Sequence, residues 1–142
     1  MMKEFRLAAL ALLPLLVFGC GKAAKEIVAD TPEGTVKGFV AAMKKGDVKS
    51  AASAYAYVSE AKASNPDWGD IPSGQRTQIV HKLQEAKAET LRGDTAKYKG
   101  DVQVGAAQTQ GSQSWVTVTA GGQQIPLQLV QEDGMWRLSG SQ

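Results

Sequence analysis

Residues 114–138 have the sequence SWVTVTAGGQQIPLQLVQEDGMWRL, which contains the clearest structural pattern of the chain. Gly121-Gly122 and Asp133-Gly134 are two-residue turn sequences, and each separates runs in which apolar and polar residues alternate. This pattern predicts three antiparallel strands joined by tight hairpins. Pairing residues outward from each turn places the same apolar side chains on one face, which fixes the register. That face comprises Val116, Val118, Ile125, Leu127, Leu129, Trp136 and Leu138.

Two details of the surrounding sequence fit this register. The nitrogen of Pro126 points to the side on which the last strand has ended, where a strand proline is tolerated. A further strand before Gly111 includes Val102 and Val104, and the small residues 105–107 that follow predict a bulge.

The residues ahead of the sheet carry helix signals. Thr31 can cap a helix that closes at Gly46, and its apolar face repeats at helical spacing through Val36, Phe39, Val40 and Met43. Asp47 can cap a second helix, whose apolar residues are Val48, Ala51, Ala52 and Tyr55. Helices followed by an antiparallel meander predict an α+β domain with the N-terminal helices packed on a curved sheet.

The middle of the chain is harder to assign. Residues 59–73 contain two prolines and a glycine, and we expect them to be mostly loop. Ser73 can cap a third helix that runs to about Leu91 and ends before Gly93. Its expected inner face is formed by Ile79, Leu83, Ala86 and Thr90, flanked by Val80.

Length and composition exclude several classes of protein. The 142 residues suit one domain, and 16 basic against 14 acidic side chains give no electrostatic footprint for nucleic acid. A single cysteine excludes an internal disulfide, and a single histidine argues against a zinc site built from cysteine and histidine. We expect no metal and no cofactor.

The N-terminus has the features of a secretory signal. Lys3 and Arg6 precede the twelve apolar residues 7–18, which are too few to span a bilayer. Val17-Phe18-Gly19-Cys20 resembles the bacterial lipobox, in which the cysteine receives a diacylglycerol and the preceding peptide is removed; Phe18 departs from the usual small residue. The resemblance implies a palmitate-type anchor on Cys20.

These features divide the chain into three parts. Residues 1–19 are the expected signal peptide, residues 20–30 the lipidated cysteine and a tether, and residues 31–142 a single α+β domain. Gly21, in place of Asp after the cysteine, implies by resemblance to Gram-negative lipoproteins the outer membrane, with the domain facing the periplasm.

Two segments also suggest a family. TPEGTVKGFVAAMKKGD at residues 31–47 and LQLVQEDGMWRL at residues 127–138 resemble small bacterial lipoproteins of unknown function in the nuclear-transport-factor-2-like, or cystatin-like cone, superfamily. The resemblance implies a sheet that curls around the first long helix, often leaving a pocket. It implies no activity, because that superfamily includes both enzymes and non-catalytic binding proteins.

The candidate catalytic residues are few. No charged side chain occurs between Val102 and Gln131, so the sheet offers no acid or base to a substrate. His81 points away from the apolar face of its helix, which favours a solvated position. Tyr55 and Tyr57 could offer a phenol to a pocket, although the spacing of Tyr55 favours core packing. Residues 65–70 begin like a calcium loop but lack its glycine, and Arg76 stands where its glutamate belongs.

The second face of the predicted sheet is the candidate partner-binding surface. Apart from Arg137 toward its end, its residues are uncharged, whereas exposed sheets are usually protected by charge. We therefore expect a second copy, another envelope protein or neighbouring loops to cover it. The superfamily resemblance also implies pairing through this face. The candidate residues are Trp115, Thr117, Thr119, Gln124, Gln128 and Val130.

Three functions therefore remain open. The favoured one is a membrane-anchored, non-enzymatic envelope lipoprotein that binds a protein partner or a small apolar ligand. The second is a subunit or inhibitor of a secretion or toxin system. The third is a small enzyme with its site inside the cone.

The lipobox leads to the first testable prediction. Replacing Cys20→Ser should abolish acylation and leave an uncleaved precursor, because Cys20 is the only thiol of the chain. Metabolic labelling with a fatty-acid probe measures this, and undiminished label on the variant would contradict the lipoprotein assignment.

Overall fold

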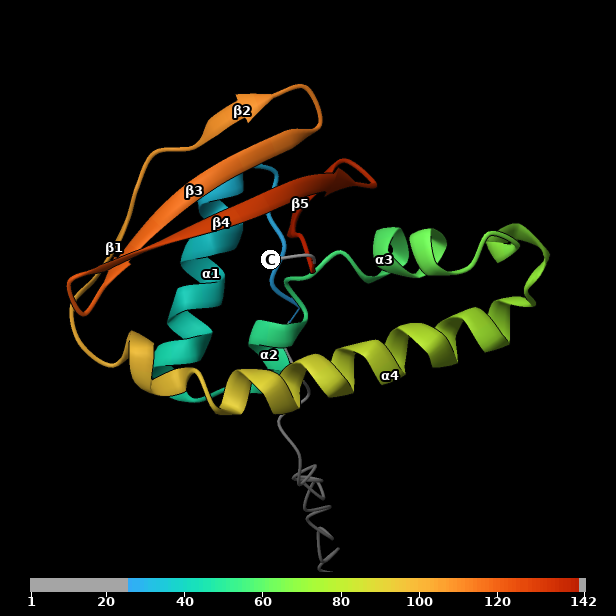
Figure 1. The fold of residues 1–142 in the computed structure, drawn as a ribbon, viewed down its shortest axis with the longest axis horizontal. Helices are drawn as coiled ribbons and strands as arrows, with labels where there is room; N and C mark the ends of the chain where they lie inside the picture. Colours follow the sequence, from blue (N-terminus) through green and yellow to red (C-terminus); the bar gives the residue numbers. More distant parts are fainter. Residues whose placement is uncertain (1–25, 141–142) are drawn as a thin grey trace, which may run out of the picture.

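The predicted hairpins lie within one sheet of the structure, a computed structural model that describes residues 26–140 (Figure 1). The expected signal peptide and Cys20 lie outside the described residues. No helix among the described residues is long and apolar enough to cross a membrane. The elements are α1 (Pro32–Lys45), α2 (Val48–Ala52), α3 (Tyr57–Ser64), η1 (Trp68–Asp70), α4 (Ser73–Arg92), η2 (Thr95–Tyr98), β1 (Val102–Val104), β2 (Gln108–Gln110), β3 (Gln113–Ala120), β4 (Gln123–Glu132) and β5 (Met135–Leu138).

The register of the sheet agrees with the sequence. The strands are antiparallel in the order β1-β3-β4-β5, with β2 also paired to β3. Val116 lies opposite Leu127, and Leu129 opposite Leu138, as the two turns require. All seven residues of the predicted apolar face are buried except Ile125, which is half-buried. Each hairpin turn makes this possible with two consecutive residues of positive φ: Gly121 and Gly122 in the first turn, and Asp133 and Gly134 in the second.

The two irregular positions are also confirmed. Pro126 lies opposite Thr117, whose carbonyl oxygen instead accepts a hydrogen bond from Gly105 at 2.8 Å. The proline nitrogen therefore faces the other side, where β5 pairs only with residues 129–132 of β4. Between β1 and β2, the three residues 105–107 lie opposite two residues of β3, which is the predicted bulge.

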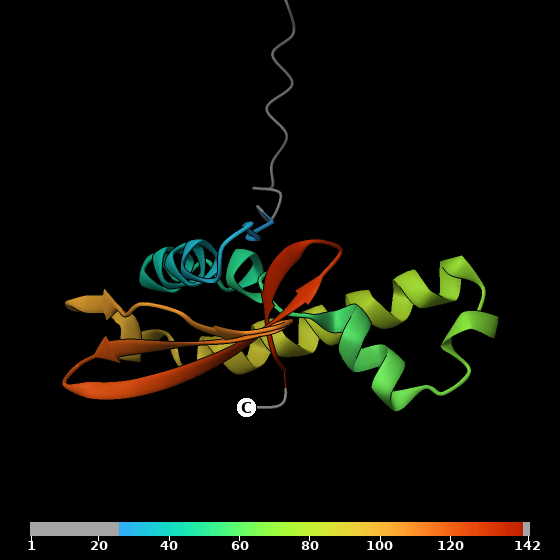
Figure 2. The same cartoon turned by 90° about the horizontal axis from the view of Figure 1, so that it is seen from above.

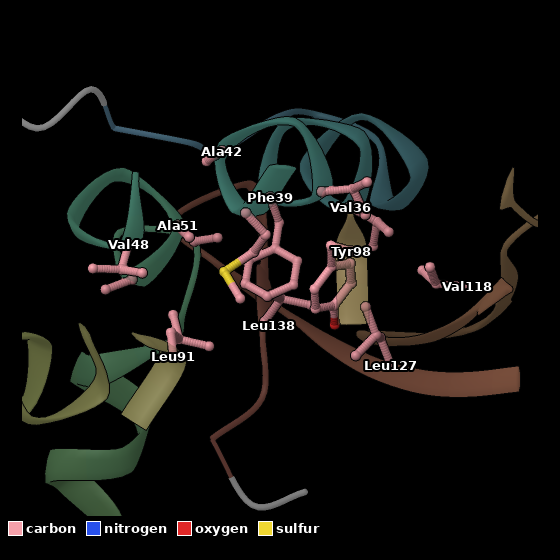
Figure 3. Packing of buried hydrophobic residues seen from close by; sticks show 14 of the residues in the cluster. Val36, Phe39, Ala42, Val48, Ala51, Leu91, Tyr98, Val118, Leu127 and Leu138 are labelled. Carbon is pink, nitrogen blue, oxygen red and sulfur yellow. The ribbon is translucent and has the colours of Figure 1, made fainter. Parts of the chain in front are cut away.

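The first helix connects the sheet to the core. The Thr31 hydroxyl accepts a hydrogen bond from the Gly34 amide, and Gly46 ends α1 in the left-handed conformation. The buried face of α1 packs against the inner face of the sheet, where Phe39 and Met43 are almost fully buried (Figure 3). Figure 2 shows α1 on one side of the sheet only. The predicted α+β architecture, with helices on a curved antiparallel sheet, is confirmed.

The outer edge of β5 is covered by two other parts of the chain. Trp136 donates a backbone hydrogen bond to Ala29, and Leu138 donates one to Ala54. The hydroxyl of Thr35, fully buried in α1, donates to the Trp136 carbonyl at 2.8 Å and accepts from the Ala29 amide at 3.0 Å. The edge strand therefore keeps few unpaired groups, and its position relative to α1 is fixed.

Two expectations for the middle of the chain are wrong. Residues 57–64 form α3, because both prolines fall after its end at Asn65 and the preceding SEAKAS segment has no helix breaker. In α4, Ala86 and Thr90 are exposed, whereas Ala88 and Leu91 are buried against α2. The apolar pattern did not reveal the inward-facing side of α4, because that side also includes the half-buried polar residues Gln84 and Lys87.

The N-terminal half of α4 and the whole of α3 form an arm that extends beyond the sheet (Figure 1). Trp68 is buried in this arm and lies under the guanidinium of Arg76, 6.0 Å from its ring centre. The packed region also begins ahead of residue 31: Ile27 donates its amide hydrogen bond to the Ser53 hydroxyl and packs beside Gly38.

The apolar face gives the second prediction. Trp136→Ala should lower the free energy of unfolding by about 3–5 kcal/mol, because a large buried side chain leaves a cavity. A chemical denaturation curve measures the loss. A change below about 0.5 kcal/mol, which is typical of surface positions, would contradict the register.

Candidate functional site

A cavity of about 330 Å³ lies where the C-terminal end of α4 and η2 meet the inner face of β4. Its apolar lining includes Phe39 from α1, Leu91 from α4, and Ile125 and Leu127 from β4. Figure 3 shows Phe39, Leu91 and Leu127 around the same space, with Tyr98 beside Phe39. This volume is at the lower end of the range for small-molecule sites.

Two tyrosines border the apolar lining. The ring of Phe39 packs edge-to-face with Tyr55 at 6.0 Å and with Tyr98 at 5.7 Å between ring centres. The second helix ends at Ala52, so Tyr55 lies after α2 and not within it as predicted. Its side chain packs against the core and also lines the cavity, so both positions considered for Tyr55 are observed. The phenol of Tyr57 is hydrogen-bonded to the Ala52 carbonyl, so this hydroxyl is already engaged.

The opening of the cavity carries charge. Lys97 forms an ion pair with Asp94 at 3.1 Å. Lys87 lies with its ammonium 4.5 Å from the ring centre of Tyr55, and no ion pair joins it to a carboxylate of residues 26–140. Two lysines against one aspartate leave the rim with one positive charge in excess, held by a half-buried lysine over an aromatic face.

The electrostatics of the tyrosines favour their neutral form. Burial raises the pKa of Tyr55, and the nearby Tyr98 and Asp94 raise it further. Burial also raises the pKa values of Tyr57 and Tyr98. A phenol that holds its proton this firmly is a hydrogen-bond donor near neutral pH, not a base.

A second hollow lies on the opposite side of Tyr55, near the β4–β5 turn. Arg137 pairs there with Glu26 at 3.0 Å and with Glu132 at 3.5 Å, and Glu132 also accepts two hydrogen bonds from Ser59 of α3. The ion pairs of Arg137 and the hydrogen bonds of Glu132 with Ser59 attach α3 and the entry segment ahead of α1 to the sheet.

A larger hollow of about 790 Å³ lies along α4 beside Lys49 of α2, and it is an open and strongly charged groove. His81 lies on its border with 68% of its side chain exposed and 3.5 Å from Glu85. The prediction of a solvated histidine is confirmed. Among residues 26–140 no group of three histidine, cysteine or acidic residues is placed to hold a metal ion.

The predicted partner-binding residues do lie together on the outer face of β3 and β4. Trp115 lies opposite Gln128, Thr119 opposite Gln124, and Val130 opposite Gln113. Thr117 and Gln124 are exposed, and the other four are half-buried. Figures 1 and 2 show no helix crossing this face, although α3 approaches its far end through Glu132.

The resemblance implied that a pocket is often present, and Tyr55 was a candidate for its lining, but the position of the cavity and the rest of its lining were not predicted. Lys87, Asp94, Lys97 and Tyr98 come from the end of α4 and from η2, which are close to β4 only after the chain has folded. One feature of the sequence could have indicated the cavity, namely Lys87 on the inward-facing side of α4. A lysine on such a face places its charged end where the protein opens to solvent.

Comparison with known protein families identifies the family of this chain. The family model of the N-terminal domain of lipoprotein LpqB matches residues 28–142. The chain belongs to this family. The match includes every helix and strand of the structure and begins within the segment that pairs with β5. The expected membership of a bacterial lipoprotein family is thereby confirmed.

Other comparisons add less to the family assignment. A solved structure from Campylobacter jejuni, provisionally named an NTF2-like transpeptidase, is similar with a TM-score of 0.47 and 22% identity. The similarity covers 77% of this chain and 97% of that one. A search of the curated proteins finds no match.

The tyrosines give the third prediction. Tyr55, Tyr57 and Tyr98 are the only tyrosines of the chain, and all three pKa values are raised above the usual value of about 10. Spectrophotometric titration of the folded protein should therefore show no phenolate near pH 10. Since the folded pKa values exceed the unfolded ones, their contribution to stability is complete below about pH 10 and is lost as the pH rises further.

The matched control is the same titration in denaturant, where all three phenols should ionise near pH 10. A phenol that ionises reversibly near pH 10 in the folded protein would contradict the burial of that side chain.

Proposed function

We propose that this chain is a membrane-anchored envelope lipoprotein whose domain is a non-catalytic binding module for a small ligand with an apolar body and one acidic group. The observation that carries the proposal is the cavity beside α4, which combines an apolar lining with the ammonium of Lys87 at its rim. This ammonium lies over the Tyr55 ring and has no ion pair with a carboxylate of residues 26–140. The lining would bury the apolar part, and Lys87 would pair with the acidic group.

Binding is favoured over catalysis by the chemistry of the lining. The raised pKa values of Tyr55 and Tyr98 make their phenols poor bases. Asp94, the only carboxylate among the described residues that line the cavity, is paired with Lys97. These residues can hold and orient a ligand. General acid–base catalysis needs a group that exchanges a proton near neutral pH.

The location is part of the proposal. Membership of the lipoprotein family supports an envelope lipoprotein, and the lipobox-like residues support an anchor at Cys20. An outer-membrane position facing the periplasm rests on Gly21 alone, and density-gradient separation of the two membranes tests it.

The fourth prediction tests the cavity with decanoate as the probe. A soluble form starting at Gly21 should bind decanoate, and Lys87→Gln should weaken binding about fivefold, which corresponds to ~1 kcal/mol for a partly exposed charge pair. Decanol, which has no charge, should bind both forms equally. Calorimetry or displacement of a fluorescent probe measures these affinities.

Two variants make this test specific. Gln123→Trp should block binding, because Gln123 is an exposed residue that lines the cavity and can change without disturbing the core. Lys62→Gln, an equal charge change on the exposed side of α3, should leave binding unchanged. Decanoate affinity that is the same in all three variants would contradict this function.

A second candidate function is supported by the outer face of the sheet. This face carries Trp115 and Val130 half-exposed among glutamine and threonine, and no charge occurs between Val102 and Gln131. We propose a second copy of the chain as its first candidate partner. Another envelope protein, such as a subunit of a secretion or toxin system, is the alternative.

The fifth prediction tests this surface. Thr117→Lys with Gln124→Lys should abolish self-association while leaving folding nearly intact, because both residues are exposed and surface changes cost little. Gln75→Lys with Gln78→Lys on the exposed part of α4 is the charge-matched control. Sedimentation measures association, and equal behaviour of both variants and the parent would refute the dimer.

A further inference from the structure

The described chain begins on the α1 side of the molecule. From Glu26 it runs along α1, where Ile27 packs so closely that a Cβ at Gly38 would lie 2.6 Å from the Ile27 side chain. Figure 2 shows this segment and α1 together on one side, with the outer face of β3 and β4 on the other. The chain therefore leaves the domain from the helical side.

The distance to the proposed anchor is short. Six residue steps separate Cys20 from Glu26, and an extended chain reaches at most ~3.6 Å per step, or about 22 Å. A lipid on Cys20 therefore keeps the surface around Glu26 within this distance of the headgroups. That surface includes a hollow lined by both Glu26 and Lys45, at the C-terminal end of α1.

The same surface is basic. The exposed stripe of α1 consists of Lys37, Ala41, Lys44 and Lys45, and the exposed Lys49 of α2 follows directly. None of these lysines forms an ion pair with a carboxylate in the described part of the chain. Arg92, Lys97 and Arg137 on other surfaces are paired with acids. The remaining lysines of the described residues that have no ion pair, such as Lys62 of α3 and Lys82 of α4, are spread over other parts of the domain and not gathered beside the entry segment.

Acids around this stripe are already engaged. Glu85 and Glu89, which line a groove together with Lys49, pair with His81 and Arg92, respectively. Asp47 accepts hydrogen bonds from the amide and the hydroxyl of Ser50 as the cap of α2. Glu33, one turn before Lys37, accepts the Ala107 amide, and Glu26 pairs with Arg137. The lysines at the end of α1 therefore present an uncompensated positive surface beside the point where the chain leaves the domain.

We propose that Lys44, Lys45 and Lys49, with Lys37 beside them, contact the anionic headgroups of the bilayer that holds the lipid anchor. This inference rests on the proposed anchor at Cys20. Anionic lipids attract basic residues held near the membrane surface, and a short tether keeps these lysines there. The contact orients the domain: α1 faces the membrane, and the outer face of the sheet points away from it, toward soluble or membrane-distal partners.

The experiment uses the mature lipidated protein in vesicles of phosphatidylcholine, with and without about 30% phosphatidylglycerol to supply a negative surface. Amine-reactive labelling followed by mass spectrometry reports the accessibility of each lysine. Labelling of Lys44, Lys45 and Lys49 should fall severalfold in the anionic vesicles, and about 0.5 M salt should reverse the fall. Lys62 and Lys82 on the arm are internal controls and should not change.

Variants keep the test falsifiable. In a K44Q/K45Q/K49Q protein, the remaining Lys37 should label equally in both vesicles. In the charge-matched K62Q/K82Q/K99Q control, Lys37 should still be labelled less in the anionic vesicles than in the neutral ones. Protection of Lys37 in the first variant equal to that in the parent would overturn the proposal.

The other outcomes are distinguishable. Protein that does not sediment with vesicles would refute the lipid anchor itself, whereas sedimenting protein with unprotected α1 lysines would refute only the orientation. Equal protection in neutral vesicles would overturn the role of anionic lipid. Protection that increases with the protein-to-lipid ratio would identify a second copy of the chain as the occupant, and would overturn the membrane contact.

Discussion

The hydroxyl of Thr35 makes the hydrogen bonds on which the arrangement of the domain depends. It is fully buried, donates to the carbonyl of Trp136 in β5, and accepts from the amide of Ala29. One side chain thus connects α1, the edge strand and the segment entering the domain. A buried polar group without its partner costs about 1–3 kcal/mol, so losing this hydroxyl would expose two backbone groups to that penalty. It fixes α1 against the sheet, and with it Phe39 and the lining of the cavity.

The features proposed to be functional lie on different sides of that arrangement. The entry segment leads the chain out beside the lysines of α1, the cavity opens where α4 and η2 meet β4, and the outer face of the sheet lies opposite α1 (Figure 2). A lipoprotein with this layout can be held on its helical side while its sheet remains accessible. The α3–α4 arm is attached to the sheet by the contact of Ser59 with Glu132, so it extends in a defined direction.

The sequence predicted the sheet well, whereas for the cavity it offered only the family resemblance and Tyr55, and the reasons are physical. Tight turns such as Gly121-Gly122 set the strand register locally, and alternation then assigns each side chain to a face. Thr31 and Asp47 likewise act within one helical turn. The cavity joins α1, α4, η2 and β4, and no local pattern encodes that meeting. The α4 stripe was misassigned because its inward polar residue, Lys87, serves an opening and not a core.

The most direct test of the binding function is an NMR titration of the folded domain with decanoate, followed through side-chain methyl groups. Occupancy of the cavity predicts that the methyl signals of Leu91, Ile125 and Leu127 shift together and saturate, while Val130 on the outer face of the sheet does not move. Shifts confined to Val130 and its neighbours on that outer face, with Leu91 and Leu127 unchanged, would contradict a ligand site in the cavity.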